Sequence, residues 1–431
     1  MPVLLLWLTL ALVPQAGAPS APTSGAAALA GVIDSAKFKT AAAALDRDFD
    51  RHVAETIRLT EIAAPPFKES ERAKVYADLF RQHGLADVEI DPEGNVLGLR
   101  LGSGPSTGSE RVGLIAIAAH LDTVFPEGTT VKVRREGTRL FAPGVGDDTR
   151  SLAVLLALIR ALDTAGLQTK ADILFVGDVG EEGPGDLRGM KYLFNKRKYA
   201  GKITAFIAAD GTATGNEIVT GGVGSKRYRV TFKGPGGHSF SDFGIVSPAF
   251  AMAGAISKFG ALTVPKSPKT TFSVGVVGGG TSVNSIPFES WMDVDMRSES
   301  RDELNRMDAS FRTFLTDAVN DENAARSTRK GHITVDVKLT GDRPSGQTPA
   351  TSRVVEIASA SVRAFGLTPK LVYSSTDSNV PISLGIPAIT LDAGGSGDRA
   401  HSLEEWIDVE KTSALRGMQM MLATLVTLAG M

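Results

Sequence analysis

The sequence predicts an α/β fold, in which a mixed, parallel-rich sheet is sandwiched by helices and carries an inserted α+β open-faced sandwich domain. Three observations support this fold class. Continuous apolar segments at 111–120, 171–180 and 203–210 are typical of strands buried on both faces. Helical segments alternate with these strands, which favours parallel pairing. Between 222 and 343 the strands instead alternate polar and apolar residues, as in a sheet with one face in water.

Periodicity and helix-ending residues predict the elements before the first buried strand. Residues 43–62 have apolar side chains at helical spacing, and a Pro-Pro pair follows them. Residues 68–84 form a second expected helix that ends in a glycine cap. The alternating segment 86–102 surrounds a Pro-Glu-Gly-Asn turn and is expected to form a hairpin. The Ala-, Ser-, Pro- and Gly-rich residues 19–36 are expected to form a linker.

The remaining elements define the expected domain limits. The large domain is expected at 37–221, with a helix at 151–166, and again at 344–431, with a strand at 387–394 between two helices. The inserted domain, 222–343, follows a strand-helix-strand-strand-helix-strand order that is typical of a small open-faced sandwich. Its expected elements lie at 226–234, 248–260, 270–280, 289–298, 300–318 and 332–342.

Length and composition restrict the class of protein. A chain of 431 residues is long enough for two domains. The net charge of −2 gives no reason to expect nucleic acid as a partner, and no segment reaches the ~20 apolar residues of a membrane span. Residues 1–30 are expected to be a signal peptide and lead-in, because the apolar run 3–13 precedes small-x-small patterns. We therefore expect an exported protein, periplasmic or secreted, or a cytoplasmic one if this segment is not a functional signal.

Ligand-type side chains follow the buried strands. They lie in HLDT at 120–123, in GEEG at 180–183 and at Asp210, and GDD at 146–148 precedes an expected helix. The carboxyl ends of parallel strands meet at one edge of a sheet, where ligands bind. Imidazole and carboxylate groups are suitable ligands for a metal pair that activates water for amide hydrolysis. The sequence therefore predicts a metal-dependent hydrolase site at this edge.

Each of these groups also has a structural alternative. Asp147 or Asp148 can be the N-cap of the helix that follows. Glu181 and Glu182 can form a solvated loop pair, although adjacent carboxylates next to a buried strand are costly without a nearby positive charge. Asp210 can begin a turn. These alternatives stay open at the level of single residues.

Three of the six histidines lie in distinctive contexts. His120 ends a buried strand, His238 lies in the glycine-rich segment GPGGHSF of the inserted domain, and His401 lies in DRAHSLEEW after the last strand. His52 and His83 have charged neighbours on expected helices, so we expect them at the surface.

Taken together, the motifs resemble those of the di-zinc co-catalytic exopeptidase and deacylase family. This family includes bacterial glutamate carboxypeptidase, peptidase T, succinyl-diaminopimelate desuccinylase and acetylornithine deacetylase. The resemblance runs from about residue 50 to the C-terminus. It depends on AAHLDTVFPEG, GVGDD, GEEG, AAD, GPGGHS, NSIP, STDSN and AHSLEEW in this order.

The resemblance implies a ligand set for two zinc ions per subunit, for which cobalt or manganese are alternatives. His120 and Asp210 would hold one ion. Glu182 and His401 would hold the other, and Asp147 would bridge both. The large domain would then be the catalytic domain.

The resemblance also implies roles for residues around the metals. Glu181 would be the general base, and Asp122 would orient the imidazole of His120. His238, often supplied by a partner subunit in this family, would stabilise the oxyanion. Asn284 would contact the substrate, and Arg297 would help to bind a substrate carboxylate. The inserted domain would act as a lid and form a homodimer through an edge of its sheet.

Two departures from the family pattern concern the loops of the site. Thr149 stands where relatives often have a lysine, and Arg150 comes one residue later. The segment SSTDSN at 374–379 has serines where relatives usually have glycines.

The expected reaction is hydrolysis of an amide bond in a small peptide by an exopeptidase. An aspartate at 210, rather than a glutamate, resembles the peptidase members of the family. An N-acyl amino-acid deacylase or related amidohydrolase is the alternative, with the same site and a different pocket. A non-catalytic binding relative is a third reading. The sequence contains neither a His-Glu-x-x-His helix nor a Gly-x-Ser-x-Gly elbow.

Overall fold

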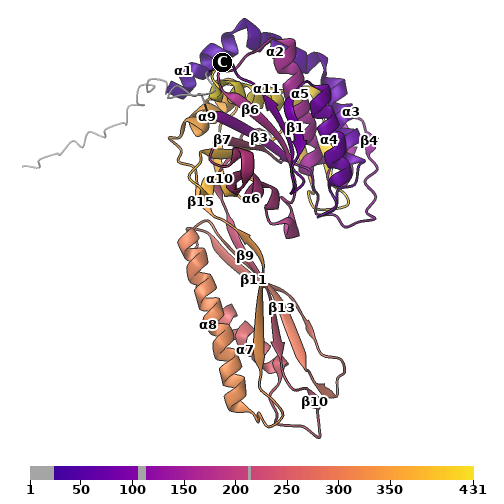
Figure 1. The fold of residues 1–431 in the computed structure, drawn as a ribbon, viewed down its shortest axis with the longest axis vertical. Coiled ribbons are helices and arrows are strands. Elements are labelled where there is room, and N and C mark those ends of the chain that lie inside the picture. The colour runs from indigo at the N-terminus through magenta and orange to yellow at the C-terminus, as the bar shows by residue number, and fades with distance from the viewer. Residues whose placement is uncertain (1–23, 105–112, 212–214) are drawn as a thin grey trace, which may run out of the picture.

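A computed structural model describes residues 24–104, 113–211 and 215–431 of the chain. The expected signal segment at 3–13 lies outside these residues. Within the described residues, no helix has the length and apolar character needed to cross a bilayer. Figure 1 shows a large domain from which an elongated inserted domain projects.

A nine-stranded mixed sheet forms the centre of the large domain. Its strands are β1 (Ala86–Ile90), β2 (Val96–Arg100), β3 (Leu114–His120), β6 (Asp172–Asp178), β7 (Ile203–Ala209), β8 (Glu217–Gly222), β15 (Gly346–Gln347), β16 (Lys370–Ser374) and β17 (Ala388–Leu391). They run in the order β1-β2-β6-β3-β7-β17-β8-β15, and β16 pairs with β8. β3 pairs parallel with β6 and β7, and β17 pairs parallel with β7, so the predicted parallel-rich mixed sheet is confirmed. The predicted hairpin is also confirmed, because β1 and β2 pair antiparallel.

Helices cover both faces of this sheet (Figure 1). They are α1 (Ser24–Asp34), α2 (Ala36–Arg47), α3 (Phe49–Thr60), α4 (Ser70–Gln82), α5 (Arg150–Thr164), α6 (Arg188–Asn195), α9 (Arg353–Ala364), α10 (Asn379–Ser383) and α11 (Lys411–Leu428). Ile115 and Ile117 of β3 belong to a large apolar core, whereas Ala116 and Ala118 belong to a second core that includes side chains of α6 and α10. Successive residues of a strand point to opposite faces, so a strand buried on both sides has a continuous apolar sequence.

A second, four-stranded sheet connects distant segments near the edge of the large domain. It has the order β18-β19-β5-β4 and consists of β4 (Arg134–Glu136), β5 (Arg139–Phe141), β18 (Ser396–Asp398) and β19 (Trp406–Asp408). The pairing of β19 with β5 brings the segment after His401 beside the segment that leads to Asp147.

The inserted domain is an open-faced sandwich. Its four-stranded antiparallel sheet has the order β11-β13-β9-β14, from β9 (Gly224–Lys233), β11 (Thr270–Gly279), β13 (Glu289–Ser298) and β14 (Thr334–Arg343). α7 (Pro248–Gly260) and α8 (Arg301–Ala325) cover one face, where Tyr228, Val230 and Phe232 of β9 are buried with Met292 and Val294 of β13. The short strands β10 (Gly237–His238) and β12 (Ser285–Ile286) pair at the end that lies away from the large domain (Figure 1).

Two expectations for the N-terminal region are wrong. Residues 24–34 of the expected linker form α1, because alanine favours helix and because Leu29 and Val32 are buried in the large core. The single helix expected at 43–62 is two helices, α2 and α3, which meet at Asp48.

His52 is a third correction, because it is buried rather than at the surface, with only 1% of its side chain exposed. It lies on the core-facing side of α3 beside Phe49. Burial lowers the pKa of His52 to about 3, and the charges of Arg150 and Arg160 act in the same direction.

We expect His52 to make the protein sensitive to acid. The unfolded chain binds a proton on this histidine near its ordinary pKa of about 6.5, whereas the folded chain does so only near 3. Between these two values the unfolded state binds more protons, so stability falls as the pH falls. Each unit of pKa difference corresponds to about 1.4 kcal/mol. In thermal melts from pH 7 to pH 4, His52→Leu should lose less stability than the parent.

The control is His332→Leu, which replaces an exposed histidine. Parallel pH profiles for His52→Leu and the parent would contradict the assignment of acid sensitivity to His52.

Candidate metal centre

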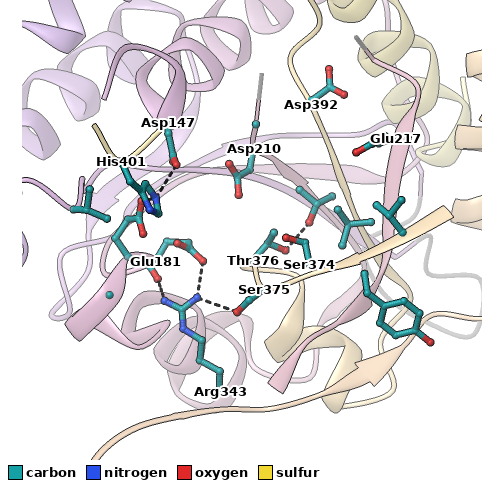
Figure 2. A pocket seen from close by; sticks show the side chains of 18 of the residues that line it. Asp147, Glu181, Asp210, Glu217, Arg343, Ser374, Ser375, Thr376, Asp392 and His401 are labelled. Atoms are coloured by element: carbon teal, nitrogen blue, oxygen red, sulfur yellow. Dashed lines mark hydrogen bonds and ion pairs between the residues drawn. The ribbon is translucent and has the colours of Figure 1, made fainter. Parts of the chain in front are cut away.

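The predicted ligands meet at one edge of the large sheet. His120 ends β3, Glu181 and Glu182 follow β6, and Asp210 follows β7. These strands are parallel neighbours, so their carboxyl ends lie together. Glu181, Glu182 and Asp210 line a cavity of about 760 Å³ together with Asp147 and His401, and His120 contacts Asp147 beside it. Figure 2 shows Asp147, His401, Asp210 and Glu181 around this hollow.

Asp147 lies between two imidazoles. Its Oδ1 is 2.9 Å from Nε2 of His120, and its Oδ2 is 3.1 Å from Nε2 of His401. The same nitrogen of His401 is 2.8 Å from Oε1 of Glu182. Because each of its two oxygens contacts one imidazole, Asp147 would help to hold both of the predicted ions. His120, Asp147 and Glu182 have ligand atoms within 4.8 Å of one another.

A second group of ligand atoms within 4.8 Å consists of His120, Asp148 and Asp210. Asp148 is fully buried, and its Oδ2 accepts the backbone N–H of His120 at 3.1 Å. Neither Asp147 nor Asp148 is the N-cap of α5, because Thr149 occupies that position and its side chain forms no capping hydrogen bond. The structural alternative of an N-cap is therefore wrong.

Asp122 holds the loop of the two glutamates more than it orients an imidazole. Its carboxylate accepts the backbone N–H groups of Gly180, Glu181 and Glu182 at 2.9, 3.1 and 2.9 Å. Its Oδ1 is 3.7 Å from Nδ1 of His120, whereas the backbone oxygen of Asp122 is 3.1 Å from that nitrogen. The imidazole is therefore oriented mainly by a carbonyl, and the carboxylate fixes the loop after β6.

Glu405 holds the loop of Asp147 in the same way, although no role was predicted for it from the sequence. Its Oε1 accepts the N–H groups of Gly146 and Asp147 at 2.7 and 2.9 Å, and its Oε2 accepts that of Gly144 at 2.8 Å. The signal was present in the string HSLEEW, where Glu405 is the second glutamate. Only the pairing of β5 with β19 shows which of the two glutamates faces inward.

The electrostatics of the site require a positive charge. Burial raises the pKa of Glu181 to about 8 and that of Asp210 to about 7, and neighbouring carboxylates contribute. Burial also opposes ionisation of Asp147, but hydrogen bonds from His120 and His401 hold its pKa below the usual range. So many buried carboxylates are stable together only beside cations. Two imidazoles with carboxylate oxygens are a donor set that suits zinc, so the residues present fit a metal pair.

The two predicted residues of the inserted domain's tip lie together but outside this cavity. Ser239 donates its backbone N–H to the carbonyl of Asn284 at 2.9 Å, and His238 pairs with Ser285 across β10 and β12. His238 is exposed at the end of the inserted domain that is far from the large sheet (Figure 1). The chain therefore does not bring its own His238 and Asn284 to the predicted metal ligands of the same chain.

Arg297 does line the cavity, where its Nε is 2.8 Å from Oδ2 of Asp295. Arg343, for which no role was predicted from the sequence, also lines the cavity and contacts Glu181. Thr149, at the position where relatives often have lysine, donates its hydroxyl to the carbonyl of Gly144 at 2.7 Å. It therefore stabilises the loop of Asp147.

Comparisons with known proteins identify the family of the chain. A family model described as Peptidase family M20/M25/M40 matches residues 116–427. Carboxypeptidase G2 of Pseudomonas sp. (strain RS-16) is 23% identical over 234 residues, or 54% of this chain and 53% of that protein, so the match spans about half of its length.

Solved structures share the fold along most of the chain. Aminopeptidase PepT of Bacillus cereus aligns with a TM-score of 0.70 at 23% identity and covers 88% of this chain and 98% of its own. The dipeptidase Dug1p of Saccharomyces cerevisiae aligns at 0.69 with 15% identity, over 91% and 98%. The YXEP protein of Bacillus subtilis, described as a dinuclear metal binding peptidase, aligns at 0.61 with 16% identity, over 88% and 97%.

We expect substitutions of Asp147 and of Glu405, which holds the loop of Asp147, to weaken metal binding to different degrees. Asp147→Ala removes a carboxylate that contacts both imidazoles, whereas Glu405→Ala removes only the acceptor that holds the loop. Loss of such an outer partner costs about 10–100-fold in metal affinity, and loss of a ligand should cost more. Metal content after dialysis against graded chelator, measured by inductively coupled plasma mass spectrometry, gives the order.

Glu404→Ala is the matched control, because this neighbouring glutamate is exposed. Equal metal content in all three variants and the parent would show that these carboxylates hold no metal.

Proposed function

We propose that this chain, which belongs to peptidase family M20/M25/M40 and is an enzyme of this metallopeptidase family, is a di-zinc exopeptidase. Its proposed substrates are small peptides. The observation that supports the proposal most directly is the position of Asp147 between His120 and His401 at the cavity. The relatives described as aminopeptidase and dipeptidase support the choice of a peptide substrate.

The side chains of the cavity have complementary roles in this mechanism. His120, Asp147, Glu182, Asp210 and His401 would hold the two ions, which when bound lower the pKa of a shared water and polarise the scissile carbonyl. The carboxylate of Glu181 accepts the proton of the attacking water and then delivers it to the leaving amine. An amine that leaves as a free amino group requires this second proton transfer.

The walls of the cavity favour a short peptide with charged ends. Arg297 and Arg227 are contributed by the inserted domain, and Glu217 and Asp392 lie on the large-domain side. A carboxylate of the substrate can pair with the guanidinium groups, and an ammonium group with the carboxylates.

An N-acyl amino-acid deacylase is the second candidate, and the apolar part of the cavity favours it. Val219, Val372 and Tyr373 line this part and provide a surface for an acyl chain. A panel of dipeptides and tripeptides, compared with N-acetyl and N-succinyl amino acids, distinguishes the two candidates. Cleavage of the acyl compounds alone would overturn the peptidase assignment.

We expect Glu181→Ala to retain metal and lose turnover. Removal of a general acid–base group typically costs about 10²–10⁴-fold in rate. Turnover of the best dipeptide and metal content are measured on the same preparation, with Glu404→Ala as the control. Turnover of Glu181→Ala close to that of the parent would exclude Glu181 as the base.

The tip of the inserted domain supports a proposal about assembly. Phe240, Phe243 and Val283 are strongly exposed there, next to His238. β11 is an edge strand of the inserted sheet, and its Val276 and Val277 are also exposed. We propose that two chains associate through this domain and that His238 of the second chain stabilises the oxyanion in the first chain's site.

Complementation between two inactive variants tests this arrangement. If each site uses Glu181 of one chain and His238 of the other, a heterodimer of His238→Ala and Glu181→Ala contains one intact site. Co-expression of the two variants with different tags should restore about a quarter of the parental sites, because random pairing makes half of the dimers mixed. Activity that stays absent in the purified mixed dimer would show that both residues act within one chain.

A further inference from the structure

The loop that carries the base is held by the inserted domain. This loop, residues 181–187, is called the base loop here. Arg227 of β9 donates Nη1–H to the carbonyl of Gly183 at 3.1 Å. The backbone N–H of Asp342 in β14 lies 3.0 Å from both carboxylate oxygens of Asp186. Two neighbouring strands of the inserted sheet therefore contact the base loop at two points.

A third contact reaches the base itself. Arg343, the last residue of β14, donates Nη1–H to Oε1 of Glu181 at 3.1 Å and Nη2–H to the carbonyl of the same residue. The same Nη1 is 3.1 Å from Oγ of Ser375, which follows β16 in the large domain. Figure 2 shows the guanidinium of Arg343 between Glu181 and Ser375. Arg343 and Glu181 each have only 5% of their surface exposed, so water competes little for these hydrogen bonds.

The backbone of the base loop is strained. Asp186 and Leu187 are consecutive residues with φ of 54° and 58°, in the left-handed region that residues with a Cβ rarely occupy. Such a conformation persists only where its surroundings hold it in place. The carboxylate of Asp186 is held by the N–H of Asp342 and by Nζ of Lys191 at 2.6 Å. The inserted domain thus contributes to the restraint of the strained part.

These contacts lie where the inserted domain is joined to the large domain. β9 begins at Gly224, just after β8 of the large sheet, and β14 ends at Arg343, just before β15. Arg343 and Asp342 pair in register with Ser225 and Lys226 at the start of β9. The two strands are therefore the stem through which the inserted domain is joined to the large domain. A rotation of the inserted domain moves this stem, and with it all three contacts.

From this geometry we propose that Arg343 is a positioning residue for Glu181, and that the stem couples the orientation of the inserted domain to the position of the base. The proposal rests on the hydrolase function proposed above, because it assigns a consequence to the position of Glu181. A bound peptide that favours one orientation of the inserted domain would thereby fix the position of Glu181. The base would then be aligned for catalysis when a substrate is present.

The variants separate positioning from charge and from folding. Arg343→Met keeps a long aliphatic side chain at this position and removes the guanidinium N–H donors. Arg343→Lys keeps the positive charge but offers a single ammonium group as donor. Asp186→Ala weakens the same restraint without changing Arg343 and serves if Arg343→Met fails to fold. Arg229→Met is the matched control, because Arg229 also lies on β9 but pairs with Asp293 and lies over Trp291.

Two measurements are made on each variant. The first is kcat and KM on the best peptide, where a base displaced by about 1 Å lowers kcat by about a hundredfold. The second is the distance between spin labels at Gln82→Cys on α4 and Thr316→Cys on α8, both exposed positions. The parent has no cysteine, so labels attach only at these two sites.

We expect Arg343→Met to lower kcat with little change in KM, Arg343→Lys to restore part of the loss, and the distance distribution of Arg343→Met to be broader than that of the parent. Arg229→Met should change neither measurement. A rise in KM alone would overturn the proposal, because it would make Arg343 a substrate contact. A fall in kcat with an unchanged distance distribution would overturn the coupling, and so would a broader distribution with unchanged kcat.

Failure of the proposed hydrolase function can be distinguished from failure of the coupling through the stem. If the parent cleaves no peptide or acyl compound, the proposed function is wrong. The distance measurement on Arg343→Met still tests whether the contacts at the stem fix the orientation of the inserted domain.

Discussion

The burial of several carboxylates at one sheet edge is the constraint on which the rest of the structure depends. Glu181 and Glu182 follow β6 and Asp210 follows β7, the two strands that flank β3, and Asp147 reaches the same cavity from the segment before α5. Carboxylates in such a site repel each other and lose hydration, and burial raises the pKa of both Glu181 and Asp210. Two imidazoles offset only part of this cost. The arrangement is that of a cation-binding site, because bound cations would make the burial of these carboxylates energetically favourable.

A second set of carboxylates holds the first set in place. Asp122 accepts three consecutive backbone N–H groups of the loop after β6, and Glu405 accepts three around Asp147. Backbone donors satisfy a buried carboxylate while also fixing the chain that carries a ligand. Asp178 and Asp377 are buried and interact with each other, and burial raises the pKa of Asp178 to about 7. The carboxylates of Asp122 and Glu405 thus fix the two loops that line the cavity.

The sequence predicted those features that follow from local pattern. β3, β6 and β7 were recognisable because a strand buried on both faces must be continuously apolar, and their ends located the ligands. β8 and β16 were not expected, since short strands with mixed burial give no distinct periodicity. His52 was misplaced because charged neighbours on a helix say little about the single face that is buried. Arg343 and Glu405 act through tertiary pairing, which no local pattern contains.

The two ends of the inserted domain relate differently to the site. β9 has 10 residues and spans about 33 Å, and α8 has 25 residues and spans about 38 Å, so the tip lies tens of ångströms from the stem. Arg343 at the stem acts within its own chain, where it already contacts Glu181. His238 lies beyond the far end of β9 and cannot reach the same cavity without dismantling the sheet that carries it. A role for His238 in hydrolysis therefore requires a second chain, and the same rigid sheet then joins one chain's base to its partner's site. In such an assembly, movement of an inserted domain would affect both cavities, because its stem restrains one base and its tip completes the other site.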